Sequence, residues 1–170
     1  MFSFKMIRKI INLGPLIILY YLSISEIDSH FENYFEILSF NIQLIIIYFW
    51  VSKRPEALGS GHIFFAGLIN DVVTGFPLGL SSLSYLIVSL VATYVKNMTV
   101  NTRITTDWFT FFIAIFFSNL ILFILLSKFS EIGVSVTEMS YNTFFTLIFF
   151  PFFWFLFTYY NSIITTGRNA

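Results

Sequence analysis

Residues 54–82 read RPEALGSGHIFFAGLINDVVTGFPLGLSS, and the fold depends on how this stretch is arranged. A short apolar segment at 62–74 is followed by the break 75–79, Gly-Phe-Pro-Leu-Gly, and then by a second apolar segment at 80–94. Proline fixes φ and glycine permits positive φ, so the break favours a tight reversal of the chain. One continuous helix would have to tolerate two glycines and a proline here. The stretch therefore predicts a helical hairpin.

The composition of the whole chain places this hairpin in a membrane. Of the 170 residues, 57% are hydrophobic and 11% are charged, whereas about 25% of the residues of an average soluble domain are charged. So few charges cannot cover the surface of a water-soluble protein of this size. The formal net charge is zero, which gives no reason to expect a nucleic-acid partner. The chain has no cysteine, and its two histidines, His30 and His62, are too far apart to suggest a metal site.

Six apolar segments are candidate membrane spans, because a helix needs roughly 20 apolar residues to cross a bilayer core about 30 Å thick. We predict an all-α membrane protein with six transmembrane helices, the third of them short, in a single integral membrane domain over residues 1–170. The predicted spans are about 10–25, 35–51, 62–74, 80–94, 108–126 and 142–160. Pro151 is expected to kink the last span. Ser23-Ile24-Ser25 resembles a signal-peptide cleavage site, but the spans that follow favour a retained first helix.

The positive charges orient these spans. Lys and Arg near span ends favour the cytoplasmic side, and an arrangement with both termini in the cytoplasm places eight of them inside and one outside. The inside set is Lys5, Arg8, Lys9, Lys53, Arg54, Lys96, Arg103 and Arg168, and Lys128 is outside. If 62–94 were a single crossing, the charges would separate the two topologies only weakly. A re-entrant hairpin keeps the same parity as two spans, so 62–94 stays open between these two forms.

Asp71 is a carboxylate within an otherwise apolar segment, where an ionised group is expensive at membrane depth. It would reach the headgroups from the outer end of its helix, act as a buried anchor bonded to a neighbouring helix or partner, or couple to an ion or proton. Gly67 and Asp71 share one helix face, and Gly75 continues that row if the helix persists. Small residues at this spacing let helices approach closely. The row predicts packing within the protein or an interface with another one, and Asn70 lies one position off it.

The candidate helix-packing or partner-binding residues are therefore Gly67, Asn70, Asp71, Gly75, Pro77 and Gly79. No catalytic residue, cofactor or metal is predicted. The turn lacks the GxxxxGK[ST] pattern of a phosphate loop.

The serines of the next segment are expected to bond their own backbone or a neighbouring helix, since no base can be assigned to any of them. They are Ser81, Ser82, Ser84 and Ser89.

The stretch resembles the MreD family of bacterial rod shape-determining membrane proteins. The resemblance rests on G-L-x-x-D followed by G-x-P-L-G and on the preceding Arg54-Pro55. It covers about thirty residues, while the rest of the chain agrees in length and hydropathy. The matching residues are Gly67, Leu68, Asp71, Gly75, Pro77, Leu78 and Gly79.

The resemblance implies a non-enzymatic inner-membrane subunit of the cell-elongation machinery, involved in cell shape and peptidoglycan synthesis. Its expected partners are an MreC-like protein, a RodA-type glycosyltransferase with its transpeptidase and, indirectly, MreB. The family is also similar to the substrate-binding subunits of energy-coupling-factor vitamin transporters, six-helix proteins of similar size, which supports the six-span fold more than it supports transport.

Two other functions stay open from the residues alone. A small-molecule or vitamin-like binding subunit of a transporter would use Asp71, Asn70 and the aromatic-rich spans to line a pocket, since transporter sites often use broken helices. A membrane enzyme acting on lipid would need an acid–base pair at one surface, such as Asp71 with Glu26 or Asp28, and nothing in the sequence joins these groups.

Overall fold

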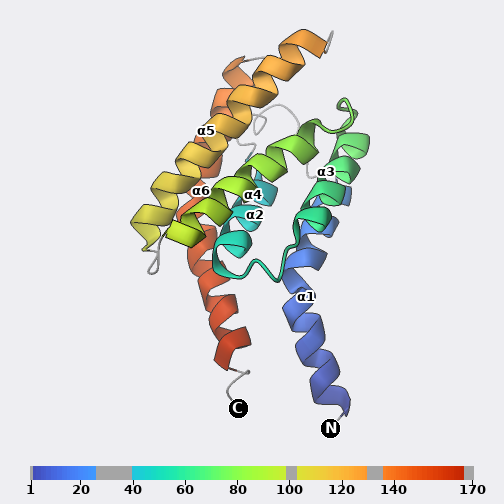
Figure 1. The fold of residues 1–170 in the computed structure, drawn as a ribbon, viewed down its shortest axis with the longest axis vertical. Coiled ribbons are helices and arrows are strands. Elements are labelled where there is room, and N and C mark those ends of the chain that lie inside the picture. The colour runs from blue at the N-terminus through green and yellow to red at the C-terminus, as the bar shows by residue number, and fades with distance from the viewer. Residues whose placement is uncertain (1, 26–39, 99–102, 130–135, 167–170) are drawn as a thin grey trace, which may run out of the picture.

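The computed structural model describes residues 2–25, 40–98, 103–129 and 136–166. These residues form six helices and no strand, so the predicted all-α class is confirmed (Figure 1). The helices are α1 (Phe2–Ile24), α2 (Ile42–Lys53), α3 (Ser60–Thr74), α4 (Leu80–Met98), α5 (Ile104–Phe129) and α6 (Val136–Thr166).

The helices agree with the predicted segments in number and order, and differ at their ends. The second span was expected from residue 35, but α2 begins at Ile42, and 35–39 lie outside the described residues. α6 begins six residues before the predicted start and continues through Pro151, so the proline does not end it. α5 and α6 are long and apolar enough to cross a membrane. The six crossings and the likeness to energy-coupling-factor subunits stay predictions.

α2 is the central helix of the fold. Every residue from Leu44 to Ser52 is buried, and the helix packs against α1, α4 and α6. Its start is fixed by Asn41, whose side-chain oxygen accepts the N–H of Leu44 at 3.2 Å and whose own N–H donates to Thr146 Oγ1 of α6 at 2.9 Å. A helix that is apolar on all sides is stable only when it is enclosed by others, which explains its place in the bundle.

Aromatic side chains join α2 to α5 and α6. Phe111 of α5 stacks on Phe150 of α6 with ring centroids 4.4 Å apart, and Tyr48 of α2 meets both rings edge-on. Two turns further along α6, Phe157 packs against Trp50 of α2. Offset and edge-to-face aromatic pairs each contribute about 1 kcal/mol beyond the area they bury, so this cluster fixes how the three helices are placed.

The first residues of α1 and the last residues of α6 lie at the same end of the molecule (Figure 1). The described helices run alternately toward and away from that end, and α4 crosses obliquely between α3 and α5. Large apolar side chains cover the outer faces of α5 and α6; examples are Phe109, Phe116, Phe152 and Phe155. Such faces suit a hydrocarbon solvent, because exposed apolar patches of this extent are rare on soluble monomers.

Candidate functional site

Asp71 lies inside the protein and holds the start of the next helix. Its side chain is fully buried at 0% exposed. Oδ2 accepts the N–H of Gly79 at 2.7 Å, and Oδ1 accepts the N–H of Ser81 at 2.8 Å. These donors open α4, where the helix leaves N–H groups without intrahelical partners and its dipole favours a negative charge. Asp71 of α3 therefore caps α4 across the turn.

The turn between α3 and α4 is built from two glycines in the left-handed region. Gly75 has φ +72° and ends α3, and Gly79 has φ +99° just before α4. The N–H groups of Gly75 and Phe76 both donate to the main-chain oxygen of Asp71, which closes the C-terminus of the helix. Pro77 is exposed in the middle of the turn, and its carbonyl oxygen accepts the N–H of Leu80 at 3.3 Å. α3 thus ends before Gly75, which is a cap rather than a further member of the Gly67 row.

Gly67 lies where α3 and α4 approach most closely. A Cβ added at this position would contact Ser82 Cα and would lie 2.5 Å from Ser82 N and 2.8 Å from its Oγ. The hydroxyl of Ser82 in turn donates to the main-chain oxygen of Phe64 at 2.9 Å. Only a residue without a side chain fits here, because the backbone of the facing helix occupies the space. Gly67 and Asp71 consequently face the same neighbour, α4.

Asn70 connects the hairpin to the rest of the bundle. Its Nδ2 donates to Ser81 Oγ at 3.1 Å, and its Oδ1 lies 3.5 Å from Nε2 of Gln43 in α2. The same Gln43 nitrogen donates to the main-chain oxygen of Leu22 in α1 at 3.2 Å. The polar side chains of this region therefore bond within the protein, and both oxygens of Asp71 are already in use as hydrogen-bond acceptors.

The four serines of α4 are all buried, and three of them make side-chain contacts with neighbouring helices. Ser84 pairs with Ser118 of α5 through their hydroxyls, while Ser81 and Ser82 bond to α3 as described. His62 lies at the other end of α3, where it bonds to Tyr20 at 3.2 Å. Among the described residues, His62 is thus bonded to Tyr20 and not to a serine hydroxyl of α4.

A second buried polar group, which the sequence analysis did not single out, joins α2, α5 and α6. Asp107 in the first turn of α5 is fully buried, and its Oδ2 accepts Lys53 Nζ and Trp154 Nε1, each at 2.8 Å. The ammonium also lies 5.8 Å from the centre of the indole ring. The other oxygen, Oδ1, is buried without a hydrogen-bond partner among the described residues. The ion pair with Lys53 is therefore the main compensation for the charge of Asp107.

The signal for this ion pair was present in the predicted topology. Lys53 was placed at the cytoplasmic end of the second span, and the predicted fifth span starts at 108 on the same side, directly after Asp107, although Asp107 itself was not considered. The sequence could not show that the two helices are neighbours at that end, or that Trp154 lies opposite them. Hydropathy predicts where each span ends along the sequence. Which span ends lie next to one another depends on how the helices pack.

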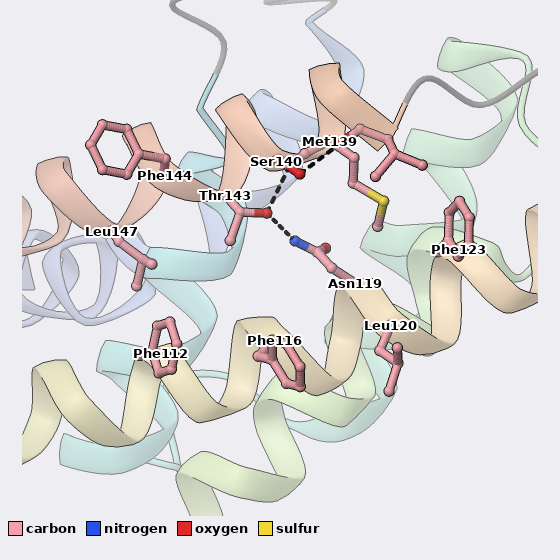
Figure 2. Close-up of a pocket in the computed structure, with 11 residues that line it drawn as sticks. Phe112, Phe116, Asn119, Leu120, Phe123, Met139, Ser140, Thr143, Phe144 and Leu147 are labelled. Carbon is pink, nitrogen blue, oxygen red and sulfur yellow. Dashed lines mark hydrogen bonds between the residues drawn. The ribbon is translucent and has the colours of Figure 1, made fainter.

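An open groove of about 430 Å³ runs between α5 and α6, away from the hairpin (Figure 2). Phenylalanines dominate its walls, among them Phe112, Phe116 and Phe144. Its polar side chains already have partners: Asn119 Nδ2 donates to Thr143 Oγ1 at 2.6 Å, and that hydroxyl donates to the main-chain oxygen of Met139. The groove thus presents an apolar surface with no cluster of convergent polar groups.

The candidate acid–base partners of Asp71 on the outer side, Glu26 and Asp28, lie outside the described residues, as does His30. Within the described ranges, no three His, Cys, Asp or Glu side chains gather as a metal site would require. What the structure brings together is a set of contacts between helices, centred on Asp71 in the hairpin and on Asp107 at the other end of the bundle.

The comparisons with known proteins agree with the resemblance carried by the hairpin. The family model for the rod shape-determining protein MreD matches residues 7–161 of the 170. A search of curated proteins and a search of solved structures find no match to the chain. The matched region contains the whole α3–α4 hairpin and both buried carboxylates. This chain therefore belongs to the MreD family, whose members are bacterial membrane proteins linked to the determination of rod shape.

Proposed function

We propose that this protein is a non-enzymatic, multi-pass subunit of the bacterial cell-elongation complex in the inner membrane. In this role it binds partner membrane proteins such as an MreC-like protein, and through them takes part in the regulation of cell shape and peptidoglycan synthesis. A RodA-type glycosyltransferase, its transpeptidase and, indirectly, MreB would be the wider partners. The observation that carries the proposal is the match of the MreD family model to residues 7–161.

The use of the polar side chains supports a binding role rather than a chemical one. Both oxygens of Asp71 accept backbone N–H groups at the start of α4, which is a structural use of this carboxylate. Asp107 is committed to Lys53 and Trp154 through Oδ2. The outer surface that remains is largely apolar, as a subunit that works through contacts with lipid and other membrane helices requires.

Six membrane helices with both termini in the cytoplasm are part of the proposal, with 62–94 as either two spans or a re-entrant hairpin, which have the same parity. The ends of α1 and α6 lie at the same end of the bundle (Figure 1), which an even number of crossings requires. Lys53, Lys96 and Arg103 lie at or beside the ends of α2, α4 and α5 that this topology puts in the cytoplasm. Residues 1–170 would then form one integral membrane domain.

A vitamin-like ligand has less support from the geometry. Ligand pockets combine an apolar lining with a few convergent polar groups that fix orientation. Asn70 and Asp71, the residues proposed for such a site, bond to the backbone and side chains of neighbouring helices. The groove between α5 and α6 offers apolar walls whose polar groups are already paired.

The proposal is tested by purification from native membranes of the bacterium that carries this chain. The tagged protein is extracted in mild detergent, and every retained protein and small molecule is identified by mass spectrometry. We expect an MreC-like protein to be retained, and we expect depletion of the chain to turn rod-shaped cells round. As a control, the variant Lys96→Met, at an exposed position of α4, should restore rod shape when it replaces the native chain.

Two results would contradict the proposal. Depleted cells that stay rod-shaped would remove the role in cell shape. A purified chain that holds a vitamin-like molecule and retains no elongation protein would favour the transport alternative.

A further inference from the structure

The tip of the α3–α4 hairpin is apolar and exposed. Leu78 is 72% exposed and Phe76 is 40% exposed, with Pro77 between them. In the whole sequence from Ala57 to Val95, Asp71 is the one charged residue, and it is buried. The turn therefore carries no charge that would hold it in water or among headgroups.

The N–H groups of the turn need little water. The N–H groups of Gly75 and Phe76 donate to the Asp71 main-chain oxygen, and Leu80 donates to Pro77. The carboxylate of Asp71 accepts two further donors, as described above, and Pro77 has no N–H. Leu78 keeps the one N–H of this turn without a partner among the described residues. Paired N–H groups suit irregular backbone near membrane depth, because hydrocarbon accepts no hydrogen bonds. The main-chain oxygens of Gly75, Phe76 and Leu78 have no donor among the described residues, so the turn must stay within reach of water at the headgroup boundary.

The length of α3 also indicates that the turn lies within the membrane. Its 15 residues rise about 22 Å at 1.5 Å per residue, whereas the hydrocarbon core is about 30 Å thick. In Figure 1 the turn after α3 stops short of the far end of α5. A helix that starts at the cytoplasmic face near Ser60 therefore ends before the opposite face.

The exposed apolar surface of the tip continues onto both helices. Phe65 and Val72 are exposed on α3, and Leu83 and Leu90 are exposed on α4. These side chains face outward along both helices, from the turn toward their middles, where acyl chains would solvate them. The tip is an extension of this lipid-facing surface.

We propose that Phe76-Pro77-Leu78 is a lipid-embedded turn. The hairpin enters from the cytoplasmic side, reverses among the acyl chains of the outer leaflet just below the headgroups, and returns. At that depth the free N–H of Leu78 is within reach of lipid ester carbonyls. Asp71 makes this possible, because it supplies the acceptors that water would supply to an ordinary loop. The inference rests on the proposed topology and is independent of the proposed partners.

The test uses the full-length chain in its native membrane. The sequence has no cysteine, so single cysteines can be introduced without background. Leu78→Cys is exposed to a membrane-impermeant maleimide from the periplasmic side and should remain unlabelled. Lys128→Cys, in the last turn of α5, should label from that side, and Glu56→Cys, between α2 and α3, should label only after the membrane is permeabilised.

A second measurement separates lipid from a covering protein. The purified Leu78→Cys variant carries a fluorophore and is placed in vesicles with nitroxide groups on either the acyl chains or the headgroups. Quenching should be stronger from the acyl-chain nitroxides. Labelling of Leu78→Cys as fast as that of Lys128→Cys would overturn the proposal, and so would a protected cysteine whose fluorophore the acyl-chain nitroxides do not quench.

Discussion

The carboxylate of Asp71 accepts the N–H of Ser81, ten residues further along the chain, at 2.8 Å. Asp71, which is part of the motif that resembles the MreD family, thus connects two helices of the same protein. Its second oxygen binds Gly79 in the same way. The hairpin is held by a charged acceptor that never reaches the surface, and its stability should depend on that acceptor.

Replacement of Asp71 by Leu should strongly destabilise the protein. It leaves two buried N–H groups without an acceptor, and hydrogen bonds to charged groups contribute about 1.5–3 kcal/mol each. Asp71→Asn, which keeps one carbonyl oxygen, should lose less. The measurement is the temperature at which the detergent-solubilised protein loses its monodisperse peak in size-exclusion chromatography. Asn70→Ala, which removes only neutral bonds, to Ser81 and to Gln43, should have the smallest effect. An unchanged temperature for Asp71→Leu would refute the capping role.

Gly67→Ala should force α3 away from α4. The new methyl group would overlap the backbone of Ser82, and overpacking of this kind costs about 1–3 kcal/mol. Gly61→Ala is the matched control, because it lies in the same helix and a Cβ there has nothing within 4 Å. Gly61→Ala should be neutral or slightly stabilising, since alanine favours a helix by up to about 1 kcal/mol over glycine. Equal stability of the two variants would mean that the close approach is not required.

Lys53→Met should be more harmful than the loss of both charges together. It leaves Asp107 buried without its cation, which costs about 3–5 kcal/mol, whereas Lys53→Met with Asp107→Asn removes the charge imbalance. A double-mutant cycle in thermal stability should show coupling between the two positions. Lys96→Met, at an exposed lysine of α4, serves as the control for a lost positive charge. Additive effects of the two single variants would contradict a direct ion pair.

The bond between Asn119 and Thr143 should contribute modestly to the contact between α5 and α6. Hydrogen bonds between membrane helices contribute about 0.6 kcal/mol on average. Asn119→Ala and Thr143→Ala should therefore each lower thermal stability slightly, and the double variant should be little worse than either one. Clear additivity would show that the two side chains act separately.

Hydropathy and the Gly-Pro break predicted much of this fold. The hairpin at Gly75–Gly79 and the six helical segments came from elementary rules of turn formation and apolar length. The burial of Asp71 was one of three open interpretations, because sequence gives the position of a carboxylate along a helix and not the depth of that position. The hydrogen bonds of Asp71 to the start of α4 now favour one of these interpretations, a buried anchor bonded to a neighbouring helix.

The ion pair of Lys53 with Asp107 was not predicted, and the reason is physical. Each residue alone looks like an ordinary charge at a span end. Their distance depends on the packing of α5 against α2 and α6, which the aromatic contacts of Phe111 and Phe150 fix. Contacts between segments 54 residues apart leave no periodic trace in a single sequence.

The enclosed position of α2 has a consequence for how the protein is made. Its residues Phe49 and Trp50 pack against Phe157, near the end of the last helix. During synthesis, α2 leaves the ribosome long before α6 exists, so its buried face must first be covered by lipid or by another protein. The bundle can close only when α6 arrives and displaces that temporary cover, so the packing around α2 is completed only after α6 has been synthesised.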